Sequence, residues 1–144
     1  MNFIWTNDTN STVYSEALSV RFDVFIDEQK VPKELEVDEF ETQALHLVLY
    51  KDNQAIGTAR VLDISAQTHK IQRVAVIKEA RNKGLGASIM KEIERYLQMS
   101  DAKSLTLGAQ IPAVPFYKKL GYTVVGEEFM DAGIPQLMMT KSLI

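Results

Sequence analysis

Hydrophobic residues along this chain follow two different periods, and each period predicts a different kind of element. Spacings of three to four positions predict amphipathic helices over residues 12–27 and from residue 85 onward. Pro32 breaks the first pattern and an acidic loop follows, while a short helix is expected between Pro115 and Gly121. The apolar positions of the two longer helices are Val13, Ala17, Val20 and Val24, and Leu85, Ile89, Ile93, Tyr96 and Leu97.

Runs rich in β-branched and aliphatic residues predict strands between these helices. Residues 44–51 and 55–62 are joined by Asp52-Asn53-Gln54, which indicates a hairpin. The order β-α-β-β-β-α-β-α-β-β predicts an α/β fold with a mixed sheet and flanking helices. The other strands are expected over residues 3–5, 70–77, 104–107, 122–125 and 137–140.

Composition narrows the class of protein. The 144 residues contain no repeat or linker, so we expect a single domain over residues 1–144. A net charge of −3 gives no basic field for nucleic acid. The absence of cysteine excludes disulfides and a cysteine nucleophile, and His46 and His69 lack metal-site spacing, so no metal is expected. Without a signal peptide or a membrane-spanning apolar run, the sequence favours a cytoplasmic enzyme or binding domain.

The connection after the strand at residues 70–77 carries the most specific signal. It reads Arg81-Asn82-Lys83-Gly84-Leu85-Gly86-Ala87 and opens directly into the amphipathic helix. Glycines let the backbone approach a ligand, and the first amides of a helix have no intrahelical partner. Because that end of a helix also favours an anion, the stretch predicts a phosphate-binding turn, to which Arg81 and Lys83 add positive charge.

Several classes of protein use such a turn, and the residues discriminate among them. A P-loop, GxxxxGK[ST], does not occur. The dinucleotide fingerprint fails because Ile89 stands where its third glycine belongs, and the nucleophile elbow GxSxG fails at Met90. The remaining pattern, R-x-x-G-x-G-A after a strand, resembles the acyl-CoA pyrophosphate loop of the GCN5-related N-acetyltransferases (GNAT). A plain strand–helix connection with turn glycines is the alternative.

Three further blocks extend the resemblance to residues 20–142. Phe116-Tyr117, followed by Gly121-Tyr122, is similar to the family's F-Y-x-x-x-G-[FY] segment. Residues 24–29 are similar to the VF-x-x-EQ segment of the ElaA/YjcF-like branch, and residues 131–139 resemble that branch's C-terminal strand. The resemblance implies the acyl-CoA N-acyltransferase (GNAT) fold, with a mixed, mostly antiparallel central sheet and flanking helices.

The resemblance also implies acetyl-CoA as cosubstrate and assigns residues to it. The strand edge at Val74, Ala75 and Val76 would pair with the pantetheine arm, and the Val76 N–H would polarise the thioester carbonyl. The pyrophosphate would lie on the amides of the glycine turn, from Arg81 to Ala87. Phe116 completes the expected coenzyme-binding set, whose turn members are Arg81, Asn82, Lys83, Gly84, Leu85, Gly86 and Ala87.

Three residues come into question for proton transfer, Tyr117, Glu28 and His46. Family members place the tyrosine that matches Tyr117 near the coenzyme sulfur, where a phenol can protonate the departing thiolate. The alternative for Tyr117 is helix packing. Glu28, at the end of the first helix, could accept the amine proton directly or through water, or could simply be a solvated charge. His46 could relay protons, although a packed strand histidine is the preferred interpretation.

Glutamines mark the expected acceptor side. Gln29, Gln110 and Gln136 are candidates to contact the acceptor, and Gln136 stands where many relatives of the branch have histidine. Glutamine cannot accept a proton at neutral pH, so another residue or water must do so if the protein is active. Residues 27–41 contain seven acidic residues and two lysines. They would favour a cationic amine if they line the acceptor channel, and are otherwise a solvated loop.

These observations lead to one preferred function and one alternative. The preferred function is transfer of an acetyl group from acetyl-CoA to a primary amine of a small, cationic acceptor. Without a cysteine nucleophile, the amine would attack directly in a ternary complex. The alternative is a non-catalytic acyl-CoA-binding or sensing module, favoured by Gln136 and opposed by Tyr117. A homodimer is a family-level expectation.

Overall fold

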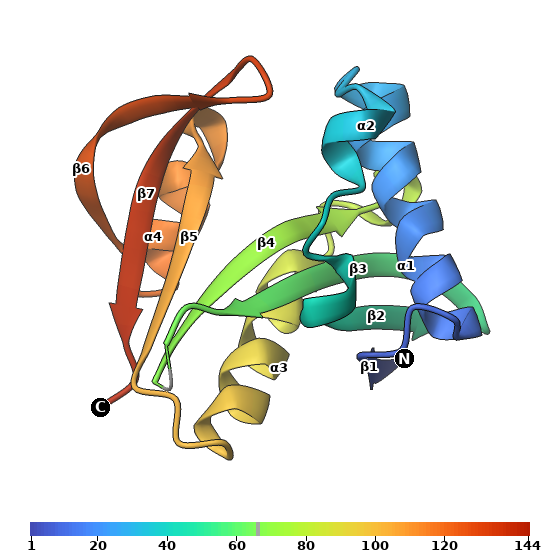
Figure 1. The fold of residues 1–144 in the computed structure, drawn as a ribbon, viewed down its shortest axis with the longest axis horizontal. Coiled ribbons are helices and arrows are strands. Elements are labelled where there is room, and N and C mark those ends of the chain that lie inside the picture. The colour runs from blue at the N-terminus through green and yellow to red at the C-terminus, as the bar shows by residue number, and fades with distance from the viewer. Residues whose placement is uncertain (66) are drawn as a thin grey trace.

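The computed structural model describes residues 1–65 and 67–144. Within these residues, seven strands form one sheet in the order β1-β2-β3-β4-β5-β7-β6 (Figure 1). Neighbouring strands are antiparallel except β4 and β5, which run parallel. The mixed, mostly antiparallel sheet of the sequence analysis is therefore confirmed. The strands are β1 (Asn2–Thr6), β2 (Leu45–Lys51), β3 (Gln54–Asp63), β4 (Thr68–Val76), β5 (Ser104–Gln110), β6 (Thr123–Asp131) and β7 (Ile134–Ser142).

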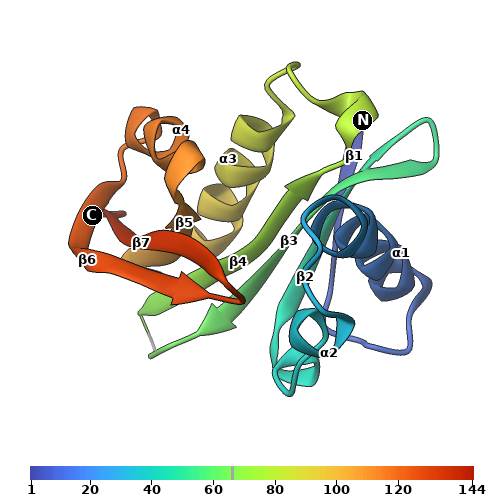
Figure 2. The ribbon, with the colours of Figure 1, turned by 90° about the horizontal axis from the view of Figure 1, so that it is seen from above.

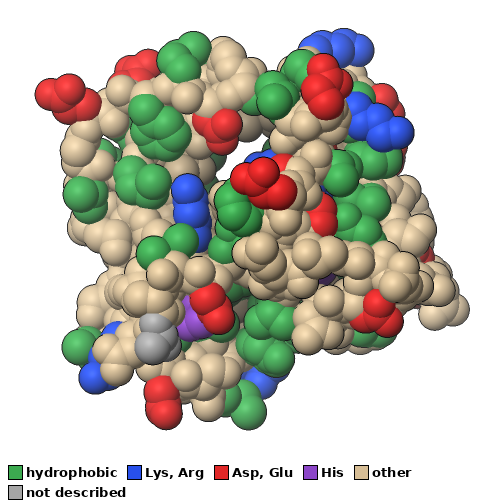
Figure 3. Space-filling model, in the orientation of Figure 1, with side chains coloured by type: hydrophobic (Ala, Val, Ile, Leu, Met, Phe, Trp, Pro, Cys, Tyr) green, Lys and Arg blue, Asp and Glu red, His purple; other side chains and the backbone are tan. Residues whose placement is uncertain are grey.

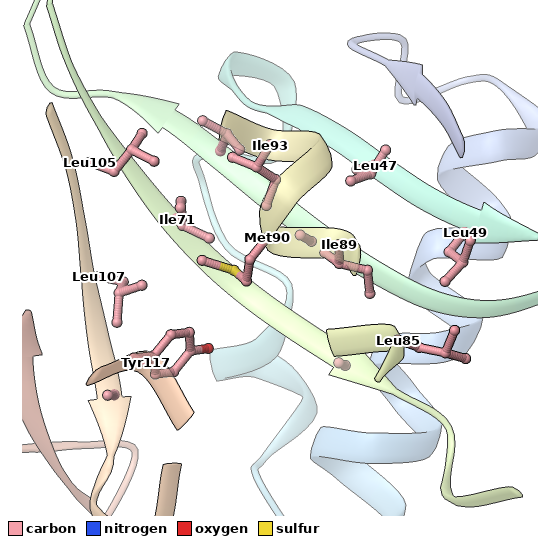
Figure 4. Close-up of a cluster of buried hydrophobic side chains, with 14 of the residues drawn as sticks. Leu47, Leu49, Ile71, Leu85, Ile89, Met90, Ile93, Leu105, Leu107 and Tyr117 are labelled. Atoms are coloured by element: carbon pink, nitrogen blue, oxygen red, sulfur yellow. The ribbon is translucent and has the colours of Figure 1, made fainter. Parts of the chain in front are cut away.

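Helices cover both faces of the sheet. Helices α3 (Leu85–Gln98) and α4 (Val114–Lys119) lie on one face, whereas α1 (Thr12–Arg21) and α2 (Lys33–Glu36) lie on the other (Figure 2). The apolar stripe of α3 is buried against the strands, as its 3.6-residue period predicts. Buried side chains at this contact include Leu47, Leu49, Ile71, Leu85, Ile89, Met90, Ile93, Leu105 and Leu107 (Figure 4).

The first helix changes its hydrogen-bonding pattern before it ends. Ser11 caps it, because its hydroxyl oxygen accepts from the Tyr14 amide at 3.2 Å. After α1 the chain continues as a π-helix, η1 (Phe22–Glu28), where the Gln29 amide donates to the Val24 carbonyl at 3.1 Å. The predicted helical span is thus correct, but its last turns are wider. Such π-helical turns occur frequently at functional sites.

Two expectations need correction. The acidic stretch is not a plain loop, because it contains α2 and the 3₁₀ turn η2 (Glu41–Gln43). The C-terminal strands are longer than predicted and form the β6–β7 hairpin, since both strands pair beyond the short apolar runs that the sequence displays. Two more 3₁₀ turns, η3 (Lys78–Ala80) and η4 (Ile111–Ala113), follow β4 and β5. Within the described parts of the chain, no helix combines the length and apolar character needed to cross a membrane.

Candidate functional site

The two parallel strands separate partway along their length and create a cleft. The β4–β5 pairing runs only from Thr68↔Ser104 to Ile71↔Leu107, and beyond it the strands diverge (Figure 1). A cleft of about 330 Å³ occupies this divergence, and η1, α2, α4 and the β6–β7 hairpin complete its walls. Figure 3 shows the surface hollowed between the hairpin and the α2 side of the molecule. Backbone groups of β4 therefore face a cavity instead of a neighbouring strand.

A β-bulge shapes the β4 edge of the cleft. Arg73 has φ 57°, a left-handed conformation that is uncommon for a residue with a side chain, and the β3–β4 register shifts there. Beyond the bulge, the Ile77 amide donates to the Ile56 carbonyl at 3.0 Å. Because alternate residues of a strand direct their backbone groups to opposite edges, Val76 directs its N–H and C=O toward the cleft.

The glycine turn follows this strand edge. Asn82 and Gly84 both have left-handed backbone angles, φ 64° and 75°, and Gly84 is the N-cap of α3. The first intrahelical bond is that of the Ser88 amide to the Gly84 carbonyl, at 3.1 Å. The amides of residues 85–87 precede that bond and thus have no intrahelical acceptor, which suits an anion. The predicted turn needs open space beside its backbone for a ligand. Gly84 has this space, because a Cβ placed there would contact nothing within 4 Å.

Gly86 makes room for a protein side chain. A Cβ at Gly86 would lie 3.2 Å from Cζ of Phe116, closer than most Cβ contacts. The missing side chain therefore lets the Phe116 ring pack against the first turn of α3. The sequence analysis expected both residues near the coenzyme but did not foresee that they contact each other.

Arg81 pairs with Glu28 at the rim of the cleft. Its Nη1 and Nη2 donate to the two Glu28 carboxylate oxygens at 2.9 and 2.6 Å, and its Nε donates to the Val76 carbonyl at 2.9 Å. The hydrogen bonds from Arg81 hold the pKa of the Glu28 carboxyl below its usual range. The guanidinium is thus engaged by the end of η1 and by β4. An ionised, paired carboxylate is also a weaker proton acceptor than a free one.

Tyr117 lies across the cleft from β4. It is buried on α4, lines the cleft, and packs edge-to-face against Phe116 with ring centroids 5.0 Å apart. Burial raises the pKa of its hydroxyl to about 12. The phenol is therefore protonated at any ordinary pH and is a hydrogen-bond donor. The ring packs on α4, as the alternative interpretation of Tyr117 expects, and the residue also lines the cleft, so its role as an acid stays a prediction.

The three glutamines expected at the acceptor side all line the cleft. Gln110 Nε2 donates to Gln29 Oε1 at 2.9 Å, which joins the end of β5 to the end of η1. Gln136 is the β7 partner of Gln110, and its side chain lies over Gly108, where a Cβ would be 2.6 Å from Gln136 Oε1. Gly108 is the sequence signal for this arrangement, because only a residue without a side chain leaves that space.

Part of the acidic segment forms a buried ionic network, while Asp27, Glu28, Glu34 and Glu39 are exposed. Three acidic residues of segment 27–41 meet three arginines from α1, β3 and β4, so they neither line the channel freely nor face water. Sequence reasoning missed this network, although arginines inside predicted strands, together with a nearby acidic segment, were a signal. The ion pairs are Arg21–Glu36 (2.7 Å), Arg21–Glu41 (2.7 Å), Arg60–Asp38 (2.8 Å), Arg60–Glu41 (2.8 Å), Arg73–Glu36 (3.0 Å) and Arg73–Asp38 (3.4 Å).

His46 belongs to the same buried region. Its Nε2 lies 2.9 Å from the Glu41 carbonyl, and because a carbonyl can only accept, this nitrogen carries the proton. The imidazole also packs edge-to-face on Tyr14, with ring centroids 4.7 Å apart. Burial lowers the pKa of His46, so the ring is neutral. The preferred interpretation of His46 as a packed strand histidine agrees with these contacts.

Comparisons with known proteins identify the family. A family model described as an acetyltransferase (GNAT) domain matches residues 10–143. The chain is 42% identical over 133 residues to YjcF of Bacillus subtilis (strain 168), an uncharacterized N-acetyltransferase, and the match covers 92% of this chain and 94% of that protein. The chain therefore belongs to the GNAT acetyltransferases, and within them to the YjcF/ElaA-like branch.

Solved structures share the fold. Escherichia coli ElaA superposes with a TM-score of 0.85 at 25% identity, covering 98% of this chain and 99% of that one. A GNAT family acetyltransferase from Elizabethkingia anophelis, solved with acetyl-CoA bound, superposes with a TM-score of 0.71 at 15% identity, covering 98% and 97%. The GNAT fold expected from the sequence is thus confirmed, and acetyl transfer is the chemistry of the family.

Proposed function

We propose that residues 1–144 form a single catalytic domain that transfers an acetyl group from acetyl-CoA to the primary amine of a small acceptor. The amine attacks the thioester directly in a ternary complex, so that a C–N bond forms, the C–S bond breaks, and the thiol leaves. The observation that carries this proposal is the unpaired β4 edge, which faces the cleft and runs straight into the glycine turn.

The β4 edge and the glycine turn are well suited to hold acetyl-CoA. An extended, amide-containing pantetheine arm can pair with the cleft-facing backbone of Val74 and Val76 as a further strand would. The Val76 N–H then donates to the thioester carbonyl oxygen, where negative charge develops during attack. The free amides at residues 85–87 donate hydrogen bonds to the pyrophosphate oxygens, and Lys83 contributes positive charge. Bound acetyl-CoA in the Elizabethkingia anophelis structure supports this assignment for the shared fold.

Tyr117 is the proposed acid for the leaving group. Its pKa of about 12 keeps the phenol protonated, so it can donate a hydrogen bond or a proton to the departing sulfur. A strongly raised pKa would be a disadvantage for a base but not for a donor that must stay protonated. Phe116 holds the ring from one side through their edge-to-face contact.

Glu28 and the glutamines act on the amine in this proposal. An alkyl ammonium has a pKa of about 10.4 and must lose a proton before it attacks. Because Arg81 lowers the pKa of Glu28, we assign Glu28 to orienting the amine or a water that carries its proton away. Gln29, Gln110 and Gln136 supply neutral hydrogen-bonding groups to the same region of the cleft. No histidine is needed at position 136 in this arrangement.

Calorimetric titration with acetyl-CoA tests the coenzyme assignment, with NADH and ATP as controls. Of the three compounds, only acetyl-CoA should bind. In an activity assay, CoA release should then depend on added amine. Replacing Tyr117 with Phe should lower kcat by about 100-fold while leaving the acetyl-CoA dissociation constant unchanged. A folded protein that does not bind acetyl-CoA would overturn the proposal.

The same variant separates an enzyme from a sensor. A non-catalytic acyl-CoA-binding module, the alternative favoured by glutamine at position 136, would bind acetyl-CoA but release no CoA with any amine. Its affinity for the coenzyme would be the only property that Tyr117→Phe could alter. Amine-dependent turnover that falls in the variant at constant affinity establishes the enzyme.

A further inference from the structure

The charges that remain unpaired inside the cleft bear on the class of acceptor. Three of the seven acidic residues that would have favoured a cationic acceptor, Glu36, Asp38 and Glu41, are neutralised by arginines within the buried network. Among the charged residues that line the cleft, Arg81 is also paired, with Glu28. Lys70 on β4 and the Asp131 carboxylate have no ion-pair partner among the described residues, whereas Arg73 is paired with Glu36 and Asp38 but keeps Nη1 available to an acceptor.

Lys70 lies on the floor of the cleft and has no partner. Its strand neighbour Ile71 is buried in the core beneath α3, so Lys70 points to the opposite face, where the acceptor side of the cleft lies. Lys70 is half-buried, and its ammonium forms no hydrogen bond or ion pair with any residue in the ranges 1–65 and 67–144. A half-buried ammonium without a counter-charge is costly and favours an anionic ligand.

Arg73 presents a second cationic group to the same space. Its contacts within the described residues run through Nε, 3.0 Å from Glu36 Oε2, and through Nη2, with three oxygens at 3.3 to 3.4 Å. No described residue accepts a hydrogen bond from Nη1, and the side chain keeps 17% of its surface exposed while it lines the cleft. The guanidinium is thus anchored by acidic residues on one side and still has donors to offer.

Asp131, the carboxylate without an ion-pair partner among the described residues that line the cleft, lies far from Lys70. The strand register aligns Lys70 with Thr106 and, through it, with Thr140, whereas Asp131 pairs with Ile134 at the other end of β7. Six residues of β7 separate Thr140 from Ile134, a distance of about 20 Å along the strand. The cleft is therefore positive at its closed end and negative at its rim, and Val76 lies toward the rim.

We propose that the acceptor carries an anionic group, a carboxylate or a phosphate, in addition to its amine, and that Lys70 and Arg73 bind that group at the closed end of the cleft. The amine then lies toward the rim, where Val76, Glu28 and Tyr117 are found. This inference rests on the proposed acetyl-transfer function and reverses the cationic acceptor that the acidic segment suggested. An acceptor that is only cationic would place an ammonium beside an unpaired lysine.

Matched amines test this proposal. Hexylamine, 6-aminohexanoate, 6-aminohexyl phosphate and 1,6-diaminohexane differ only in the group at the far end. Because six residues of β4, about 20 Å of strand, separate Val76 from Lys70, the same four compounds with eight, ten and twelve carbons are included. We expect kcat/KM for one of the two anionic amines to exceed that of hexylamine by about 10- to 100-fold, the usual effect of a charge-assisted hydrogen bond, and the diamine to be the poorest substrate. The better of the carboxylate and phosphate probes identifies the anion.

Lys70→Met should bring the ratio of kcat/KM for the anionic amine to kcat/KM for the plain amine close to one, without changing the dissociation constant of acetyl-CoA. Lys91→Met, on the exposed face of α3, is the matched control and should change none of these values. Equal turnover of the plain amine and both anionic amines at every chain length, or a preference that survives Lys70→Met, would overturn the proposal.

A binding measurement separates failure of this inference from failure of the proposed function. If no amine is acetylated although acetyl-CoA binds, 6-aminohexanoate and 6-aminohexyl phosphate are titrated into the CoA-saturated protein. Binding that is lost in Lys70→Met supports the anion site even without turnover. No binding of either probe to the wild-type protein refutes the site, whatever the fate of the enzymatic proposal.

Discussion

At the scale of single residues, the Arg81–Glu28 pair joins two assignments that the sequence kept apart. The sequence placed Arg81 with the phosphates and Glu28 with the amine. In the structure each of the two carboxylate oxygens accepts from the Arg81 guanidinium, and the pair bridges the end of η1 to the strand before the glycine turn. The pair therefore connects the coenzyme side of the cleft to the acceptor side.

The pH dependence of the Glu28→Gln variant tests what the pair does. Since hydrogen bonds from Arg81 lower the pKa of Glu28, the carboxylate stays ionised from pH 6 upward, and any titration there belongs to the amine. We expect kcat/KM to fall roughly 10-fold at every pH, with the shape of the pH–rate profile unchanged. If the variant instead loses an ionisation between pH 5 and 8, Glu28 is the general base itself.

Gly108 provides a second test at this scale. In Gly108→Ala the added Cβ would meet Gln136 Oε1 at 2.6 Å and the Phe129 ring at 3.2 Å, so the glutamine must move. We expect KM for the amine to change by about 10-fold, with the acetyl-CoA dissociation constant unaffected. Steady-state kinetics and calorimetry measure the two quantities.

Gly57→Ala is the control for this variant. It adds the same atom on the opposite face of the sheet, 2.9 Å from Ile89 Cδ1, and should lower stability without changing KM for the amine. An unchanged KM in Gly108→Ala, or an equal change in both variants, would show that Gln136 does not contact the acceptor.

Sequence reasoning reached residues whose role follows from local backbone chemistry. Gly84 could be predicted at the turn because a tight connection from a strand to a helix favours a residue that can adopt a left-handed backbone angle. Its φ of 75° agrees with this prediction. Arg73 and Lys70 could not be predicted. Whether a strand arginine is buried, paired or exposed depends on which segment folds over it, and here that segment is α2, which is far away in the sequence.

At the scale of elements, the acidic segment works as a structural connector. α2 and η2 bring Glu36, Asp38 and Glu41 onto the arginines of α1, β3 and β4, which ties the α1 side of the cleft to the bulged strand. The sequence displayed only the excess of acidic residues. The arginines that pair with these acidic residues lie on three distant elements, so no local pattern could distinguish a buried network from a solvated loop.

Glu41 is the test of this network. Burial would raise the pKa of its carboxyl, but the hydrogen bond and charge of Arg21 and further interactions lower it from 4.5 to about 2. The unfolded state thus binds more protons, and the stabilisation is complete above pH 4.5 and lost as pH falls toward 2. We expect Glu41→Gln to lower the free energy of unfolding at pH 7 by about 3 kcal/mol, and this difference to shrink through that window.

Urea unfolding of both proteins between pH 2 and 7 gives these free energies. Glu39→Gln, at an exposed neighbouring position, should change the free energy of unfolding by less than about 0.5 kcal/mol. A Glu41→Gln difference that stays constant between pH 2 and 7 would show that the carboxylate is not stabilised by the arginines.

At the scale of the whole molecule, the cleft exists because the two halves of the sheet share only a short parallel contact. β1–β4 with α1 and α3 form one half, and β5–β7 with α4 form the other (Figures 1 and 2). The element order and sheet type could be predicted from periodicity and family resemblance. The point where β4 and β5 separate could not, because it depends on the bulge at Arg73 and on the long C-terminal hairpin.

A ligand that fills this divergence should join the two halves and stabilise the whole chain. At 100 times its dissociation constant, acetyl-CoA should add about 2.7 kcal/mol to the free energy of unfolding and raise Tm by roughly 8 °C, whereas ATP should have little effect.

Gly84→Val places a side chain in the space before the free amides and strains a residue with φ 75°. Its own Tm should be lower, and its shift with acetyl-CoA should nearly vanish, while Tyr117→Phe keeps the full shift. Scanning calorimetry of the three proteins measures this, and a full shift in Gly84→Val would mean that the turn does not bind the pyrophosphate.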